Sequence, residues 1–109
     1  MTVAAEVHTI VLIGEADLLG APNIEAAFAD AAAGDARRIV VDLRKLTFID
    51  SSGLQTLITG HQQCLARDRE LSIVPGPASV QRLFEIAGMS DALPFCAAED
   101  LPGADTSSV

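Results

Sequence analysis

A chain of 109 residues with a formal net charge of −8 has room for one hydrophobic core and offers few cations to a polyanion. Half of the residues are apolar but none is Trp or Tyr, so aliphatic side chains and four Phe must build that core. Seven basic residues are too few to neutralise a nucleic-acid backbone or to hold an anionic membrane surface, which excludes both and favours a protein partner.

The first predicted element is a strand over 7–13, a segment rich in β-branched residues that stops at Gly14. A polar loop follows, and a helix is predicted to begin after Pro22 and to end at Gly34. Its apolar residues recur at the helical spacing i, i+3, i+4 and i+7: Ile24, Ala27, Phe28 and Ala31.

Further along the chain, short apolar runs predict strands over 39–43 and 71–74, the first of them covered on both faces. Helical patterns occupy about 52–67 and 80–88. Residues 93–96 predict a last strand at an edge of the sheet, where the proline of this segment is tolerated.

The predicted order is therefore β-α-β-α-β-α-β. Such alternation implies right-handed crossovers and an α/β fold with a largely parallel sheet. Residues 1–101 are predicted to form a single domain, and 102–109 a disordered C-terminal tail.

Neither cysteine indicates chemistry. Cys64 and Cys96 are isolated, and no spacing of Cys and His suggests a metal site, so both are interpreted as small buried apolar side chains. No segment has the pattern of a signal peptide or the length of a membrane span. We expect a cytoplasmic protein with no cofactor or metal of its own.

The helix over 52–67 has an unusual surface, because the sixteen residues from Ser51 to Ala66 carry no formal charge. At 100° per residue, one face is predicted to pack on the sheet: Leu54, Leu57, Ile58, His61 and Leu65. The opposite stripe is predicted to meet solvent: Ser52, Thr56, Thr59 and Gln63. Absence of charge is typical of the centre of a protein–protein contact, although a helix can also be polar and uncharged without binding anything.

The start of this helix suggests a switch. Asp50 or Ser51 is placed to cap it, and capping alone would account for the DSSG sequence. A helix N-terminus also suits an anion, so a phosphoryl group on Ser52 would be compatible with the fold. Its roughly −1.5 to −2 charges would oppose burial of the uncharged stripe against a partner.

These residues carry a family resemblance. The segment IVVDLRKLTFIDSSGLQTLI resembles the signature of STAS domains, the sulphate-transporter and anti-sigma-factor-antagonist family. LIGEADLLGAPNIEAAF is similar to the family's first loop and helix, and LSIVPGPASVQRLFEIAGM to its later strand and helix. The resemblance spans about residues 7–97 and implies a STAS-type fold with a mixed, mostly parallel sheet of four to five strands.

The resemblance implies an anti-sigma factor antagonist rather than an enzyme. Such a protein binds an anti-sigma factor that is also a serine kinase of the histidine-kinase-like ATPase fold, which frees the sigma factor. The kinase, which would hold ATP and Mg²⁺, phosphorylates the serine before the glycine and so breaks the complex. A metal-dependent serine/threonine phosphatase restores it.

Carried over to this chain, the acceptor is Ser52, with Ser51 as the alternative. The residues expected to meet the partner are Asp17, Asp50, Ser51, Gly53, Gln55, Thr56, Thr59 and Gln63. Two departures stand out. The family begins with two antiparallel strands, but only about ten residues precede Val11 here, and Ala16 stands where a bulkier apolar residue is common.

Two other functions are compatible with parts of the sequence. A hydrolase would need a base to activate Ser52. The candidates are His8, in a strand, and His61, which is predicted on the apolar helix face and is more often a core residue there. The GxSxG motif of serine hydrolases is absent. A non-phosphorylated STAS scaffold could instead brace an ATPase in a membrane-associated complex such as a lipid ABC transporter. Such scaffolds often carry Thr at the acceptor position, so Ser52 favours the switch. A small-ligand sensor is a third alternative, although nothing in the sequence marks a pocket.

Overall fold

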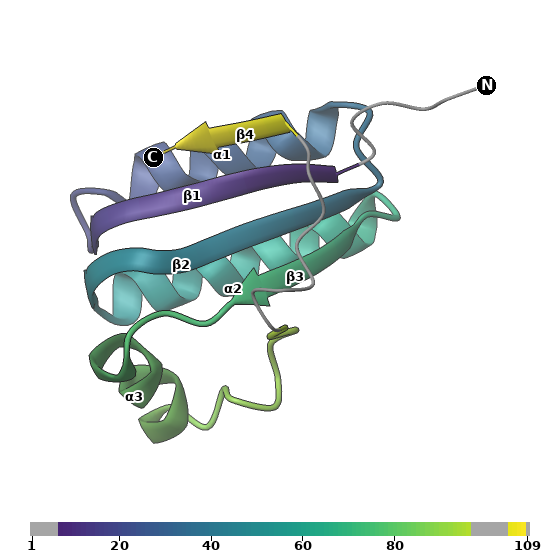
Figure 1. Ribbon diagram of the computed structural model, residues 1–109. Coiled ribbons are helices and arrows are strands. Elements are labelled where there is room, and N and C mark those ends of the chain that lie inside the picture. Colours follow the sequence, from purple (N-terminus) through teal and green to yellow (C-terminus); the bar gives the residue numbers. More distant parts are fainter. Residues whose placement is uncertain (1–6, 97–104, 109) are drawn as a thin grey trace.

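The computed structural model describes residues 7–96 and 105–108. Strands and helices alternate in the predicted order (Figure 1). The elements are β1 (Val7–Ala16), α1 (Ala21–Ala33), β2 (Arg38–Ile49), α2 (Ser51–Ala66), β3 (Glu70–Val74), α3 (Ala78–Ile86) and β4 (Asp105–Ser108). No helix within the described residues is both long enough and apolar enough to cross a membrane.

The sheet has the strand order β3-β2-β1-β4, and each described pair of neighbours is parallel. This confirms the α/β class and the largely parallel sheet. Strand β2 is longer than predicted because it continues through Arg44 and Lys45. The register between β1 and β2 shifts between Val11 and Ile13 and again after Gly14. Bulges of this kind redirect side chains, which allows the adjacent residues Arg44 and Lys45 both to be exposed.

The fourth strand is not the predicted one. Phe95 makes only an isolated parallel bridge to Ile73, supported by hydrogen bonds of 2.8 Å from the N–H of Ile73 to the carbonyl of Pro94 and from the N–H of Cys96 to the carbonyl of Ile73. The strand at the other edge is β4, which pairs with residues 8–11 of β1. Residues 105–108, which were predicted to belong to a disordered tail, form this strand.

The remainder of the predicted tail, residues 102–104 and 109, lies outside the described residues. The family's first antiparallel strand, which the sequence predicts to be short, shifted or missing in this chain, would fall on residues 1–6, and these lie outside the described residues too.

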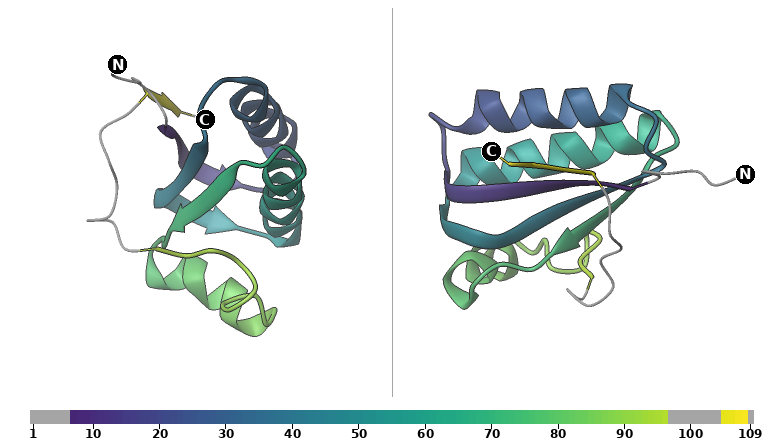
Figure 2. Two further views of the ribbon diagram at one scale, coloured as in Figure 1. Left: turned by 90° about the vertical axis from the view of Figure 1, so that its right-hand side faces the viewer. Right: turned by 45° about the horizontal axis from the view of Figure 1, so that its top comes forward.

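Helices α1 and α2 lie side by side on one face of the sheet, whereas α3 stands apart from them and contacts β2 (Figure 2). The core between helices and sheet is mainly aliphatic, with Ile10, Val41 and Ile73 fully buried on neighbouring strands and Phe28 of α1 almost fully buried. Phe84 of α3 is also fully buried, and its ring meets that of Phe95 edge-to-face at a centroid distance of 5.1 Å.

An ion pair in β2 joins the buried carboxylate of Asp42 to the guanidinium of Arg44, whose side chain is 52% exposed. The carboxylate of Asp42 accepts hydrogen bonds from the backbone N–H of Arg44 at 3.0 Å and from its guanidinium, the shortest at 2.7 Å from Nη2. These side-chain hydrogen bonds lower the pKa of Asp42 below its ordinary value of 3.8.

We therefore expect the stability conferred by Asp42 to depend on pH. A lowered folded-state pKa means that the contribution is complete above about pH 4 and is lost as the pH falls through that pKa. Asp42→Asn should be less stable than the wild type in urea at pH 7, and the gap should close as the pH is lowered below the ordinary value. Arg44→Gln should behave likewise, because a protonated Asp42 needs no cation. A gap that is the same at pH 7 and pH 3 would contradict this.

Candidate functional site

The candidate site lies where β1, β2 and β3 end. Their carboxyl ends point toward the same end of the molecule, at the left of Figure 1. Each strand is followed there by a turn and a helix. In parallel α/β sheets this is the end at which ligands and partners are usually bound. The three connections are residues 17–20, Asp50 and residues 75–77.

Asp50 caps α2, as one of the two alternatives predicted. Its backbone is extended, and its carboxylate accepts the N–H of Gly53 at 3.0 Å. Its own N–H donates to the carbonyl of Ala16 at the end of β1, at 3.1 Å. Two neighbouring elements thus hold the first turn of α2 in place.

Gly53 serves packing. It is buried, and a Cβ at this position would collide with the backbone carbonyl of Ala16 and lie 2.9 Å from the Ala16 Cβ. Only glycine lets the helix approach the strand so closely. Gly53 was expected to meet a partner; in this structure it is buried and its close approach to Ala16 gives it a role in packing.

Asp17 shapes the loop after β1. Its carboxylate accepts the N–H of Gly20 at 2.9 Å, and its carbonyl accepts the N–H of Ala21 at the same distance. Ala16, the residue before Asp17, contacts the first turn of α2, so this loop lies beside that turn. The loop presents Leu18 and Leu19, which are 71% and 87% exposed and which sequence reasoning did not single out.

The two candidate acceptors occupy the first turn of α2. Ser51 is exposed and Ser52 is partly exposed. The hydroxyl of Thr56 donates a hydrogen bond of 2.8 Å to the carbonyl of Ser52, the residue one helical turn earlier. Threonine side chains often make this bond within helices. Thr56 itself is only 4% exposed, so the prediction that it meets solvent is wrong.

The remaining polar residues of α2 do form one exposed, uncharged region. The amide of Gln55 donates to the hydroxyl of Thr59 at 3.3 Å along this face. We call it the α2 surface and define it by the exposed or partly exposed polar residues Ser51, Ser52, Gln55, Thr59, Gln62 and Gln63. Gln62 was missed by the sequence analysis, because the predicted stripe was rotated about the helix axis.

The rotation comes from contacts between α1 and α2. The Phe28 ring of α1 lies 2.6 Å from where a Cβ on Gly60 would stand, so Gly60 permits a close approach within the molecule. Cys64 is buried one turn later, where burial raises the pKa of its thiol. As a consequence Leu65 is 59% exposed and His61 only half-buried, although both were predicted to pack on the sheet.

Comparison with known proteins places this geometry in a family. The family model described as "Mlab, STAS domain" matches residues 1–95. The anti-sigma-B factor antagonist of Staphylococcus aureus is 31% identical to this chain over 78 residues, which are 72% of each chain.

Solved structures share the fold. The unphosphorylated anti-sigma factor antagonist SpoIIAA superposes with a TM-score of 0.69 at 22% identity, over 85% of this chain and 84% of that one. Phosphorylated SpoIIAA of Bacillus gives 0.66 at 22%, over 92% and 91%. A sulfate transporter family protein of Wolinella succinogenes gives 0.73 at 16%, over 91% and 84%. From the matched model and the identity to its relative, the chain belongs to the STAS domain family.

Proposed function

We propose that this protein is an anti-sigma factor antagonist whose α2 surface binds a kinase-type anti-sigma factor, and that phosphorylation of Ser52 releases the complex. The observation that carries the proposal is the position of Ser52: it stands partly exposed in the first turn of α2, at one end of a surface without charges. The name of the Staphylococcus aureus relative supports the same class of function.

The physical basis is desolvation. Serine, threonine and glutamine side chains can be buried against a partner if their hydrogen bonds are replaced, whereas an unpaired charge would have to lose its hydration. A phosphoryl group on Ser52 would add roughly −1.5 to −2 charges next to the carboxylate of Asp50, in a chain of net charge −8. The helix N-terminus would tolerate the group, but an interface would not.

The surrounding residues have distinct proposed roles. Gln55, Thr59 and Gln63 contact the partner directly, and Asp50 and Asp17 hold the loops on either side of the acceptor. Ser51, which is more exposed than Ser52, is the alternative acceptor. The partner kinase supplies ATP and Mg²⁺, a serine/threonine phosphatase reverses the reaction, and the exchange takes place in the cytoplasm, where sigma factors act.

A second candidate is a scaffold that braces an ATPase of a membrane-associated complex, such as a lipid ABC transporter, without being phosphorylated. The description of the matching family model and the fold shared with a sulfate transporter family protein favour it. Purification from the native host distinguishes the two: an anti-sigma kinase is recovered in one case and a transporter ATPase in the other.

The direct test uses the candidate anti-sigma kinases of the same genome. Each is incubated with the protein, ATP and Mg²⁺, and the phosphate is mapped by mass spectrometry. We expect a single phosphate on Ser52, none on Ser52→Ala, and full modification of Ser51→Ala. If Ser52→Ala is still fully modified, Ser52 is the wrong acceptor; if no kinase binds or modifies the protein, the switch itself is refuted.

A further inference from the structure

An open groove of about 260 Å³ lies between the carboxyl end of β2 and α3, at the lower left of Figure 1. Its lining includes Thr47, Phe48, Ile49, Arg82, Leu83 and Ile86. Ile49 is buried and Leu83 half-buried, whereas Phe48 is 49% and Ile86 73% exposed. The groove therefore presents apolar surface to water, and a partner that covers it gains the free energy of burying that surface.

Exposed apolar side chains are concentrated around the first turn of α2. The large apolar residues that are most exposed in the described part of the chain are Ile13, Leu18, Leu19, Phe48, Leu65 and Ile86. Leu18 and Leu19 belong to the loop after β1, and Phe48 and Ile86 to the groove. Single exposed apolar residues are common on soluble proteins, but a group of them at one end of a molecule indicates a contact surface.

The α2 surface does not contain apolar anchors of its own, because it consists of serine, threonine and glutamine side chains. Most of the binding energy of a protein interface comes from a few large side chains that become fully buried. Phe48 and Ser52 are four residues apart in the chain, so their Cα atoms are separated by at most about 14 Å. An interface of ordinary size covers about 800 Å² of each partner, roughly 30 Å across. A partner that covers Ser52 therefore reaches the groove.

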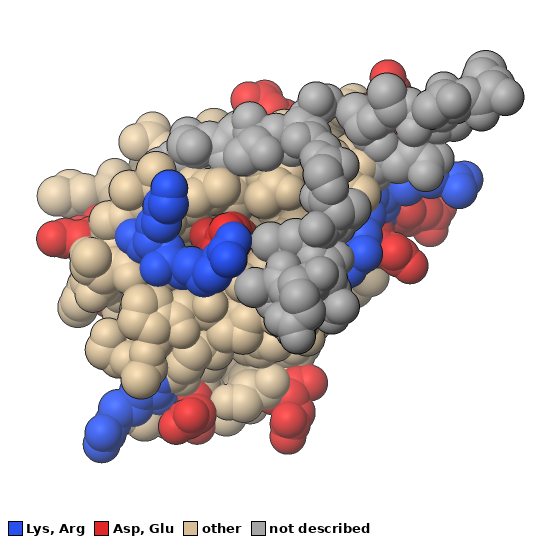
Figure 3. Space-filling model, viewed as in Figure 1, with Lys and Arg blue, Asp and Glu red and all other residues tan. Residues whose placement is uncertain are grey.

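The charge beside the groove indicates the chemistry of the partner. Figure 3 shows neutral side chains over most of the surface between the end of β2 and α3. Among the described residues, Arg82 is the charged residue of the lining and no acidic residue contributes to it, although the whole chain has 15 acidic residues. A solvated arginine alone does not indicate a ligand. Next to apolar surface, it favours a partner segment in which a carboxylate stands near an apolar side chain.

We propose that the groove between β2 and α3 binds an acidic, apolar segment of the anti-sigma factor partner, with an apolar side chain between Phe48 and Ile86 and a carboxylate on Arg82. The inference rests on the proposed function, because it extends the interface that contains Ser52. In this arrangement the groove supplies affinity by burying apolar surface, and the uncharged α2 surface makes the complex sensitive to a phosphate.

A second copy of the chain is a less suitable occupant of the groove. Each copy carries a net charge of −8, so two copies repel each other over most of their surfaces.

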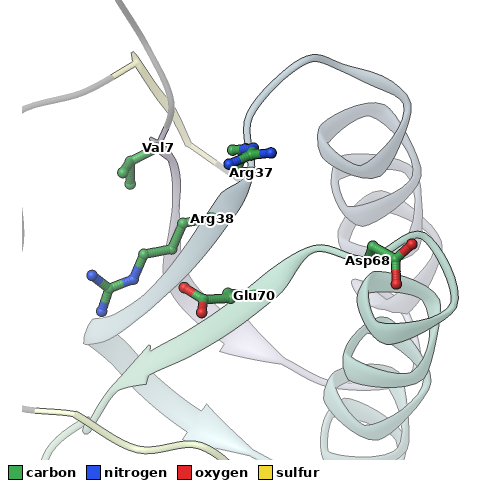
Figure 4. A pocket seen from close by; sticks show the side chains of 5 residues that line it. All are labelled: Val7, Arg37, Arg38, Asp68 and Glu70. Carbon is green, nitrogen blue, oxygen red and sulfur yellow. The ribbon is translucent and has the colours of Figure 1, made fainter. Parts of the chain in front are cut away.

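A larger hollow, of about 420 Å³, lies at the opposite end of the sheet, where β2 and β3 begin. Its charged side chains point away from one another, with Asp68 beside the end of α2 and Arg38 and Glu70 on the other side of β3 (Figure 4). Among the described residues of its lining, only Val7 is apolar. This hollow therefore lacks the apolar surface that distinguishes the groove.

The test measures, by calorimetry, how groove variants bind the purified anti-sigma kinase that phosphorylates the wild type. We expect Phe48→Ser and Ile86→Ser each to weaken binding roughly tenfold or more. Leu65→Ser is the matched control, because Leu65 is 59% exposed but lies at the other end of α2. It should bind within about twofold of the wild type. Thermal unfolding checks that each variant is folded, and the high exposure of Ile86 keeps its variant informative if Phe48→Ser is unstable.

A second pair of variants tests the charge. Arg82→Glu and Arg67→Glu change the net charge equally, and Arg67 is an exposed cation at the far end of α2. We expect Arg82→Glu to weaken binding roughly tenfold and Arg67→Glu by less than about threefold, with a smaller difference at high ionic strength. Equal weakening by the two variants would contradict a carboxylate on Arg82.

The outcomes separate the groove from the switch. If Phe48→Ser and Ile86→Ser bind like the wild type while Ser52→Asp still binds weakly, the groove is refuted and the proposed function stands. If the wild type binds none of the candidate kinases, both are refuted. If the wild type self-associates in sedimentation, and Ile86→Ser abolishes this without changing kinase binding, the groove belongs to a second copy and the proposal is overturned.

Discussion

Ser52→Asp is expected to lower the affinity for the anti-sigma factor partner about 100-fold, because a charge desolvated without a counter-ion costs several kcal/mol at an interface. The fold should tolerate the change. Ser52 is partly exposed and lies in the first turn of α2, where a carboxylate interacts favourably with the helix dipole. Binding is measured by calorimetry with the purified partner, and stability by thermal unfolding.

The matched control is Ser52→Asn, which has nearly the shape of Asp but no charge. We expect it to bind within about tenfold of the wild type, so that the difference between the two variants isolates the charge. The proposed switch would be contradicted if Ser52→Asn and Ser52→Asp weakened binding equally, because side-chain size would then explain the loss. It would fail as well if Ser52→Asp unfolded the protein while each folded molecule kept its affinity.

Gly53→Ala is expected to destabilise the fold by about 3 kcal/mol, at the upper end of what one added methyl group costs in a tightly packed site. The new Cβ would meet the backbone carbonyl of Ala16, and a backbone group cannot turn aside as a side chain can. Relief would require α2 to move away from the end of β1, which would also disturb the hydrogen bond from Asp50 to Ala16. Urea unfolding at neutral pH measures the change.

Gly34→Ala is the control for this prediction. Gly34 has a φ of −78°, and a Cβ there would find its nearest neighbour at 3.5 Å, an ordinary contact. Both variants reduce the freedom of the unfolded chain in the same way, so that effect cancels in the comparison. We expect Gly34→Ala to change stability by no more than about 0.5 kcal/mol. Equal stability of the two variants would show that α2 does not approach β1 as closely as described.

The order of the elements was predictable because each has a clear local signal. Gly34 ends α1 and Asp50 caps α2, as the sequence indicated, and the apolar runs in β1, β2 and β3 lie within the strands observed. Strand β4 had no such signal, because residues 105–108 read DTSS and contain no apolar residue. Its position depends on pairing with β1, almost a hundred residues earlier in the chain. A local sequence pattern contains no information about such a distant partner.

The candidate site was predictable in part for a related reason. A helical wheel counts Leu65 as core and gives no weight to Gly60, yet the contact with Phe28 draws the glycine inward and turns Leu65 outward. Thr56 was assigned to the surface by the same count. The hollow of about 420 Å³ lined by Val7, Arg38 and Glu70 could not be foreseen, because these residues begin three different strands that only the sheet register brings together.

The tight seat of Gly53 against Ala16 has a consequence for any enzyme that modifies Ser52. Because the first turn of α2 is held against the end of β1, drawing Ser52 out as an extended peptide into a deep catalytic cleft would require this packing to be lost. Such a kinase must have an open, shallow active centre that accepts a folded substrate, and a synthetic peptide of residues 47–66 should be a poor replacement for the intact domain.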